Sequence, residues 1–137
     1  MSRPLFSKWM EKVESAASLP KGSLMRELLS EFLGTLVLVL VGDGSVAQWV
    51  FMNKEAGGFL GVNICYGLAV FLGVLIAGGA SGAHLNPAVT VAMATIGKFS
   101  FARVIPYIAA QLLGAFVAAG LLFGVYRGKC PLPLNIE

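Results

Sequence analysis

The fold is decided by one stretch of sequence, Gly78-Gly79-Ala80-Ser81-Gly82-Ala83-His84-Leu85-Asn86-Pro87-Ala88-Val89-Thr90. Its first part is rich in glycine, which is unfavourable inside a helix. Asn86 then stands where an N-cap residue is favoured, and Pro87 where the first helical residue is favoured. The apolar run 87–97 follows, and as a helix it reaches about 16 Å, roughly half of a hydrocarbon core of about 30 Å. The stretch therefore predicts a half-length helix that starts from an irregular loop.

Three longer apolar segments flank this loop, at about residues 28–51, 57–80 and 104–126. About 20 apolar residues are enough to cross a bilayer as a helix, and each segment exceeds that length. The second and third carry no charged residue, whereas the first contains Glu31 and Asp43. The sequence thus predicts an all-α membrane protein with three transmembrane helices and one re-entrant half-helix.

The composition agrees with a chain that lies in a membrane. Hydrophobic residues make up 57% of the sequence and charged residues 12%, and the mean hydropathy is +0.81. Soluble domains carry about 25% charged residues. The bilayer is therefore the first expected partner, and no basic stripe with interleaved aromatic residues suggests nucleic acid.

Metal binding and catalysis are not expected. The single histidine, His84, cannot form a multi-histidine site, and two cysteines, Cys65 and Cys130, make neither a zinc site nor a disulfide framework. No nucleophile, base and orienting group occur together, as an enzyme would need. We therefore expect no metal, no cofactor and no enzymatic activity.

The Lys and Arg residues predict the orientation in the membrane. If the half-helix dips in and returns, seven of them lie on the side of the amino terminus and three on the other side. An excess of positive charge marks the cytoplasmic side. We therefore expect a cytoplasmic tail at 1–25, the membrane region at 26–127 and a truncated outer loop at 128–137. The charge count favours re-entrance only modestly, and the short length of the 87–97 run is the stronger argument.

The irregular loop predicts a passage for neutral molecules. Non-helical backbone at membrane depth is tolerated only where it is buried in protein or lines a water-filled cavity. A half-helix that begins there directs its positive end to the membrane centre, which raises the barrier for cations. The side-chain amide of Asn86 can donate hydrogen bonds to the oxygen of a passing molecule. Backbone carbonyls can accept hydrogen bonds from that molecule at Gly82, Ala83, His84 and Leu85.

The motif around Asn86 resembles the signature of the major intrinsic protein family, the aquaporins and glycerol facilitators, in the run His84-Leu85-Asn86-Pro87-Ala88-Val89-Thr90-Val91. Asn-Pro-Ala alone is a weak tripeptide, but here Ser81-Gly82-Ala83-His84 precedes it. Further similarity to the family lies in Glu31-Phe32-Leu33-Gly34-Thr35, Tyr66-Gly67-Leu68 and Gln111-Leu112-Leu113-Gly114-Ala115-Phe116. The resemblance covers about residues 25–127. The stretches that favour the glycerol-conducting branch over the water-selective one are Gly44-Ser45-Val46-Ala47-Gln48 and Val104-Ile105-Pro106-Tyr107.

The resemblance implies one repeat of a six-helix aquaporin-like bundle, in which the pore forms where two half-helices meet. The pore-lining residues that it implies are Gly82, Ala83, His84, Leu85, Asn86, Pro87, Ala88 and Tyr66. Glu31 and Gln111 would support the pore loop from inside the bundle. Tyr66 would supply an aromatic ring to the selectivity filter, although tyrosine departs from the Phe or Trp common there. The alternatives are a plain helix cap for Asn86, a satisfied interior histidine for His84 and a packed aromatic for Tyr66.

The expected function is passive transport of glycerol, water or other small neutral solutes across a membrane, by expectation the plasma membrane. The family implies an oligomer of aquaporin-type subunits. With one half-helix, this chain is expected to be a partial or truncated channel that does not conduct alone. Two copies could form a pore only if both orientations occurred in the membrane, which the charge bias opposes. The alternative is a non-conducting short form that modulates full-length subunits through small-residue faces such as Gly120 and Gly124.

Overall fold

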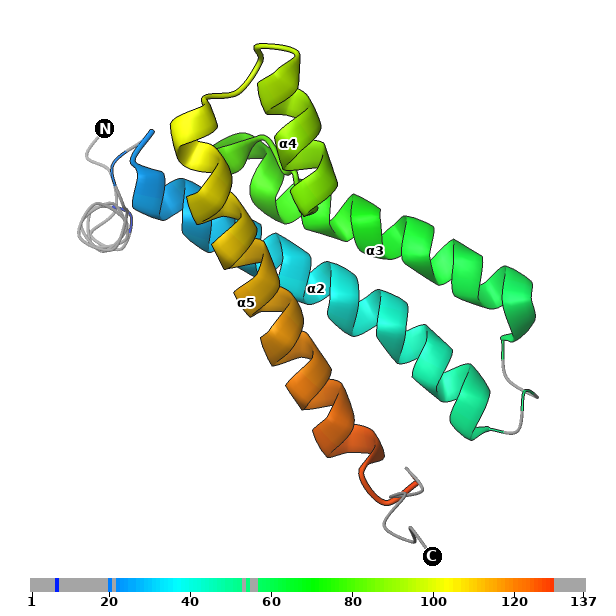
Figure 1. Cartoon of the computed structure of the whole chain (residues 1–137). Coiled ribbons are helices and arrows are strands. Elements are labelled where there is room, and N and C mark those ends of the chain that lie inside the picture. Colours follow the sequence, from blue (N-terminus) through cyan, green and yellow to red (C-terminus); the bar gives the residue numbers. More distant parts are fainter. Residues whose placement is uncertain (1–6, 8–19, 21, 53, 55–56, 130–137) are drawn as a thin grey trace, which may run out of the picture.

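The computed structural model describes residues 7, 20, 22–52, 54 and 57–129. From Leu24 onward its helices are α2 (Leu24–Phe51), α3 (Gly58–Ser81), α4 (Pro87–Thr95) and α5 (Phe101–Tyr126). Figure 1 shows α2 running between α3 and α5, with the short α4 at the end where α3 stops and α5 starts. The prediction of an all-α fold, with one short helix among three long ones, is confirmed.

Two of the long helices begin earlier than the predicted spans. α2 starts four residues before position 28, because the hydroxyl of Ser23 caps it by accepting a hydrogen bond from the N–H of Arg26 at 3.4 Å. α5 starts at Phe101, three residues before position 104, with Ser100 as its N-cap residue. Both helices therefore begin next to a serine that lies outside the apolar run.

The half-helix α4 is shorter than the predicted 87–97. It ends at Thr95, and the N–H of the capping residue Ile96 bonds to backbone carbonyls of the last turn. Gly97 follows with φ 74°, in the left-handed region that favours glycine. The apolar run continues past this point, but the left-handed residue stops the helix.

The turn between α3 and α4 is held in an unusual conformation. Gly82 has φ 88°, and the non-glycine residues Ala83 and Leu85 have φ 53° and 52°. A left-handed conformation costs a non-glycine residue roughly 1–2 kcal/mol. It persists only where the surrounding structure fixes it. The contacts around this turn are therefore of functional interest.

Glycine allows α2 to contact its two long neighbours at backbone distance. A Cβ atom on Gly114 of α5 would lie 2.4 Å from the carbonyl oxygen of Phe32 on α2. A Cβ atom on Gly73 of α3 would lie 3.0 Å from the carbonyl oxygen of Gly34 on α2. Small residues permit such close packing between helices in lipid. α2 is thereby the central helix of the bundle (Figure 1).

The interior holds polar side chains together with apolar ones that are mostly alanines, and large apolar side chains cover the surface. The largest fully buried side chains are Tyr107, Gln111, Glu31 and Thr90. Large apolar side chains are exposed along α3 and α5, for example Phe59 and Phe116, each 76% exposed. By length and composition both α3 and α5 can cross a membrane, and only 11% and 22% of their most apolar stretches are buried. This distribution suits a bundle surrounded by lipid or by other helices rather than by water.

Candidate functional site: the loop between α3 and α4

One carboxylate lies at the centre of the site. Glu31 on α2 is fully buried and accepts hydrogen bonds from four donors. Its Oε1 accepts from the hydroxyl of Ser81 at 2.5 Å and from the N–H of His84 at 2.9 Å. Its Oε2 accepts from the N–H of Leu85 at 2.7 Å and from Nε2 of Gln111 at 2.8 Å. Burying a charge is costly unless such bonds compensate it. Glu31 therefore anchors the left-handed turn to the interior of the bundle.

A chain of hydrogen bonds continues from this carboxylate to the half-helix. Nε2 of Gln111 also donates to Oγ1 of Thr90 on α4 at 3.0 Å. The hydroxyl of Thr90 donates to the carbonyl oxygen of Asn86 at 3.1 Å and lies 3.2 Å from Nδ1 of His84. Both Thr90 and Gln111 are buried. The first turn of α4 is thus tied through α5 to the same anchor as the loop.

Asn86 opens the half-helix and stays exposed. Its Oδ1 accepts a hydrogen bond from the N–H of Ala88 at 2.8 Å, and Pro87 occupies the first helical position. No residue in the described part of the chain accepts a hydrogen bond from its Nδ2. The oxygen therefore caps the helix, while the NH₂ group is left as a donor. Capping and pore lining, the two roles considered for Asn86, would thus use different atoms.

A hollow of about 320 Å³ lies beside Asn86. The side chains and backbone that line it belong to Leu38, Val70, Val74, Ala83, His84, Leu85, Asn86 and Val89. Its walls on α2 and α3 are apolar, and its polar groups come from the loop and the start of α4. Apolar walls with a few placed polar groups are typical of sites that take small molecules. Three other predicted pore residues, Gly82, Pro87 and Ala88, adjoin this lining along the chain and are exposed or half-buried.

Leu85 and His84, both predicted to line the pore, have buried side chains, 6% and 8% exposed. Leu85 lies between α2 and α3, so that a Cβ atom on Gly73 would be 2.7 Å from its Cδ1. The ring of His84 packs edge-on against Phe99 at 4.7 Å and, tilted, against Tyr107 at 5.4 Å. Both side chains therefore hold the turn in place, whatever their backbone contributes to the hollow.

The structure does not bring Tyr66 to this hollow. Tyr66 lies 15 residues before Ser81 on α3, about 22 Å along the helix axis. Its hydroxyl donates to the carboxylate of Asp43, and its ring lies against Gly42, where a Cβ atom would be 2.6 Å from a ring carbon. It lines a separate hollow of about 450 Å³ between the long helices. These contacts are those of a packed aromatic, and a filter role stays a prediction.

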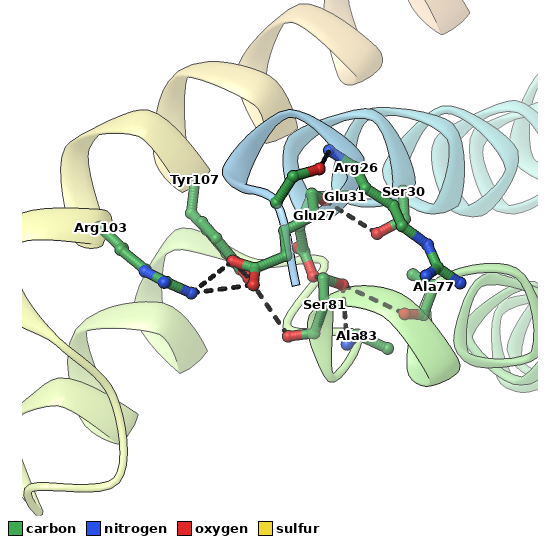
Figure 2. Close-up of polar contacts among 10 residues, drawn as sticks. Arg26, Glu27, Ser30, Glu31, Ala77, Ser81, Ala83, Arg103 and Tyr107 are labelled. Atoms are coloured by element: carbon green, nitrogen blue, oxygen red, sulfur yellow. Dashed lines mark hydrogen bonds and ion pairs between the residues drawn. The ribbon is translucent and has the colours of Figure 1, made fainter. Parts of the chain in front are cut away.

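A second polar cluster lies at the ends of the helices (Figure 2). NH1 of Arg103 on α5 donates to both carboxylate oxygens of Glu27 on α2, each at 2.8 Å. The single hydroxyl proton of Tyr107 is shared between Oε2 of Glu27 at 2.9 Å and the carbonyl oxygen of Ser81 at 3.3 Å. The cluster thus joins the first turns of α2 and α5 to the last residue of α3.

This cluster was not predicted from the sequence, although the spacing of its residues along the helices indicates that they lie near the loop. Glu27 lies four residues before Glu31, and Tyr107 lies four residues before Gln111. Residues four apart share one face of a helix, so each lies one turn from a predicted support of the loop. Within the described part of the chain, no three His, Cys, Asp or Glu side chains are grouped to hold a metal ion.

These features define a class of protein. A bundle of apolar helices with a partly polar interior receives a half-helix whose N-cap residue, Asn86, is an exposed amide. Non-helical backbone is tolerated at membrane depth in this arrangement because the loop is anchored in protein and adjoins a hollow. Such discontinuous helices build the solute sites of membrane channels and transporters.

Comparisons with known proteins make the class specific. The profile of a family described as MIP, major intrinsic protein, matches residues 18–135. Human aquaporin-9 is 44% identical over 106 residues, which are 77% of this chain and 36% of the relative. Aquaporin-10 of Milnesium tardigradum is 48% identical over 103 residues, which are 75% of this chain and 25% of the relative. The X-ray structure of the aquaglyceroporin from Plasmodium falciparum matches with a TM-score of 0.74 and 40% identity, over 80% of this chain and 47% of that chain.

The chain belongs to the major intrinsic protein family, whose members are channels and not enzymes. The family predicted from the motif around Asn86 is therefore confirmed, and the similarity to an aquaglyceroporin agrees with the predicted branch. The chain spans 36% of the length of human aquaporin-9 and 25% of the Milnesium tardigradum relative.

Proposed function

We propose that this chain forms one wall of a channel that passes glycerol, water and other small neutral solutes across a membrane. The observation that carries the proposal is that the two ends of the Asn86 side-chain amide have different roles. Its oxygen accepts a hydrogen bond from the N–H of Ala88, its NH₂ group has no acceptor among the described residues, and the residue lines the hollow beside the loop. A donor fixed in this way can replace a hydrogen bond that a solute hydroxyl or water loses on leaving bulk water.

The geometry also supports exclusion of cations. α4 begins at Pro87, so its free N–H groups and positive dipole end lie at the turn that carries the hollow. Of the two carboxylates near the loop, Glu31 is buried under four hydrogen bonds and Glu27 is paired with Arg103. Neither is left free to attract a cation into the passage. A neutral molecule with hydroxyl groups meets no such barrier.

The wall is one part of a pore. The hollow at Asn86 is lined by α2, α3, the loop and the start of α4, and it is partly open. A second half-helix, from another repeat, would close it as in the inverted-repeat architecture. We therefore propose that the described bundle does not conduct alone, that its amino terminus faces the cytoplasm of the plasma membrane, and that it works beside further aquaporin-type segments.

The test is solute-driven swelling of proteoliposomes. The chain is reconstituted alone, and also together with the part of human aquaporin-9 that it does not match, which supplies the second wall. Asn86→Asp keeps the capping oxygen but removes the NH₂ donor and adds a charge. Asn63→Asp, the same change on the exposed side of α3, is the matched control.

We expect glycerol-driven swelling only when both parts are present. Asn86→Asp should lower the swelling rate roughly tenfold or more, because it removes a hydrogen-bond donor and adds a charge in a passage that holds little water. Asn63→Asp should leave the swelling rate within about a factor of two. Swelling by the chain alone would contradict the single-wall proposal. Flux that is indifferent to Asn86→Asp would contradict the pore-lining role.

A second candidate function rests on a different observation. A Cβ atom on Gly120 or Gly124 of α5 would have no atom within 4 Å, so this small-residue spacing is not used inside the described bundle. Such a face is suited to pack against a helix of another subunit. The chain would then modulate full-length channels without lining their pores. In that case Gly120→Leu, but not Asn86→Asp, would abolish its effect on the flux of a co-reconstituted full-length channel.

A further inference from the structure

Among the polar attachments of the left-handed turn, those to Glu31 and to Tyr107 share no acceptor oxygen. Glu31 holds the N–H groups of His84 and Leu85 from one side. The hydroxyl of Tyr107 shares its proton between Glu27 and the carbonyl oxygen of Ser81, where α3 ends and the turn begins. Figure 2 shows Tyr107 reaching from α5 toward Glu27 and Ser81.

Tyr107 is itself held in position. Its side chain is 1% exposed, and its hydroxyl donates to Oε2 of Glu27 at 2.9 Å. Both oxygens of Glu27 in turn accept from NH1 of Arg103 at 2.8 Å. Hydrogen bonds of this charge-assisted kind are stronger and more directional than neutral ones. The ion pair thus fixes the acceptor that orients the Tyr107 hydroxyl.

The ring of Tyr107 makes a further connection to the loop. It packs edge-on against Phe99 at 4.6 Å and lies 5.4 Å from the ring of His84. One side chain of α5 therefore contacts the start of the turn through its hydroxyl and the middle of the turn through its ring. Arg103, by contrast, is 44% exposed, so the outer end of this cluster is open to the surroundings.

We propose that Tyr107, oriented by the Glu27–Arg103 ion pair, is a positioning residue that sets the conformation of the Ser81–Leu85 turn. It acts separately from Glu31 and determines where the backbone of this turn lies beside the hollow. The consequence for solute passage rests on the function proposed above, but the positioning itself does not.

The experiment measures amide hydrogen exchange of the whole chain in lipid vesicles, resolved to the turn and to the middle of α2. Tyr107→Phe keeps the ring contacts and removes only the hydroxyl. Tyr126→Phe removes a hydroxyl from the other end of the same helix, where the ring stacks on Phe51, and is the matched control. Glu27→Gln keeps a hydrogen-bond acceptor for Tyr107 but loses the ion pair with Arg103.

We expect Tyr107→Phe to speed exchange at His84 and Leu85 about three- to tenfold, as for the loss of a partly buried hydrogen bond. Exchange at residues 36–41 of α2 should not change, and Tyr126→Phe should change neither region. Glu27→Gln should act in the same direction by a smaller factor. The double variant should match Tyr107→Phe alone, because Glu27 acts through the tyrosine.

Two results would overturn the proposal. The first is unchanged exchange in the turn of Tyr107→Phe. The second is an equal acceleration in the turn and in the middle of α2, which would mean a general loss of stability. Because hydrogen exchange requires no solute flux, a chain that shows the expected exchange pattern but no Asn86-dependent swelling would contradict the proposed channel function alone.

Discussion

Gly34 of α2 lies against the side chain of Leu85, so close that a Cβ atom on the glycine would be 2.5 Å from Cδ2 of the leucine. The leucine belongs to the loop, and the glycine belongs to the crossing between α2 and α3. Loop conformation and helix packing are therefore coupled at this point. The strained backbone of Leu85, with φ 52°, is maintained because its side chain occupies this gap.

The first prediction concerns this gap. Gly34→Ala would place a methyl group near Leu85 and also 3.1 Å from both the carbonyl oxygen of Gly73 and Cβ of Ala77. The leucine could shift, but the backbone on the opposite helix could not shift easily. We expect a loss of about 1–3 kcal/mol in the free energy of unfolding, typical of overpacking, measured by SDS titration in mixed micelles.

Gly78→Ala on α3 is the control for this substitution, because a Cβ atom there would meet only Val74, at an ordinary 3.8 Å. It should be neutral or slightly stabilising, since alanine favours a helix over glycine. Equal stability of Gly34→Ala and Gly78→Ala would mean that the Leu85 gap is not closely packed.

The second prediction concerns the buried carboxylate. Each oxygen of Glu31 accepts two hydrogen bonds, so Glu31→Gln would turn an NH₂ group toward two donors. Leaving buried donors unsatisfied costs about 1–3 kcal/mol each.

We expect Glu31→Gln to lower the free energy of unfolding by about 2–5 kcal/mol in the same mixed-micelle titration. The amides of His84 and Leu85 should also lose protection from hydrogen exchange. Asp43→Asn, at the exposed acid of the same helix, should cost less than about 1 kcal/mol. A Glu31→Gln variant as stable as the Asp43→Asn variant would rule out the anchoring role.

The fold could be predicted from the sequence because its strongest signals are local. Apolar runs near membrane length predict long helices whatever their neighbours. Asn86 and Pro87 mark the start of the half-helix because capping and proline preferences act on one turn only. The N-termini of α2 and α5 differ from the predicted starts by four and three residues, because the helices begin after Ser23 and Ser100, which lie outside the apolar runs.

The parts of the site that could not be predicted depend on distances across the fold. Glu27 and Arg103 are 76 residues apart in sequence, and no local pattern pairs them. The buried position of the His84 side chain depends on Phe99 and Tyr107, which come from the segment after the half-helix. The contacts of Tyr66 depend on Gly42, whose missing side chain leaves room for the ring. Such close contacts become visible only when the helices are placed side by side.

The third prediction separates the two contacts of Tyr66. Gly42→Ala would place a Cβ atom 2.6–3.0 Å from three atoms of the tyrosine ring, so the ring would have to move. Tyr66→Phe removes only the hydrogen bond to the exposed Asp43. We expect Gly42→Ala to lower the free energy of unfolding by about 1–3 kcal/mol and Tyr66→Phe by about 1 kcal/mol or less. The reverse order in the mixed-micelle titration would show that the ring is held by its hydroxyl rather than by its packing.

The fourth prediction concerns Gly114, at the crossing of α2 and α5, where an added Cβ atom would come nearer to a neighbour than at any other glycine described. A Cβ atom there would lie 2.4 Å from the carbonyl oxygen of Phe32 and 3.2 Å from the N–H nitrogen of Leu36. Both neighbours are backbone atoms of a helix, so the two helices would have to separate. Gln111 lies one turn before Gly114 on the same face of α5, and such a separation would pull its amide away from Glu31. We therefore expect Gly114→Ala to lower the free energy of unfolding by about 3 kcal/mol, at the upper end of overpacking, and to speed amide hydrogen exchange at Leu85.

Gly120→Ala, six residues further along α5, is the control. A Cβ atom there would have no atom within 4 Å, so this variant should change neither stability nor exchange. If Gly114→Ala lowered stability without affecting exchange in the loop, the helix crossing and the loop would be independent of each other.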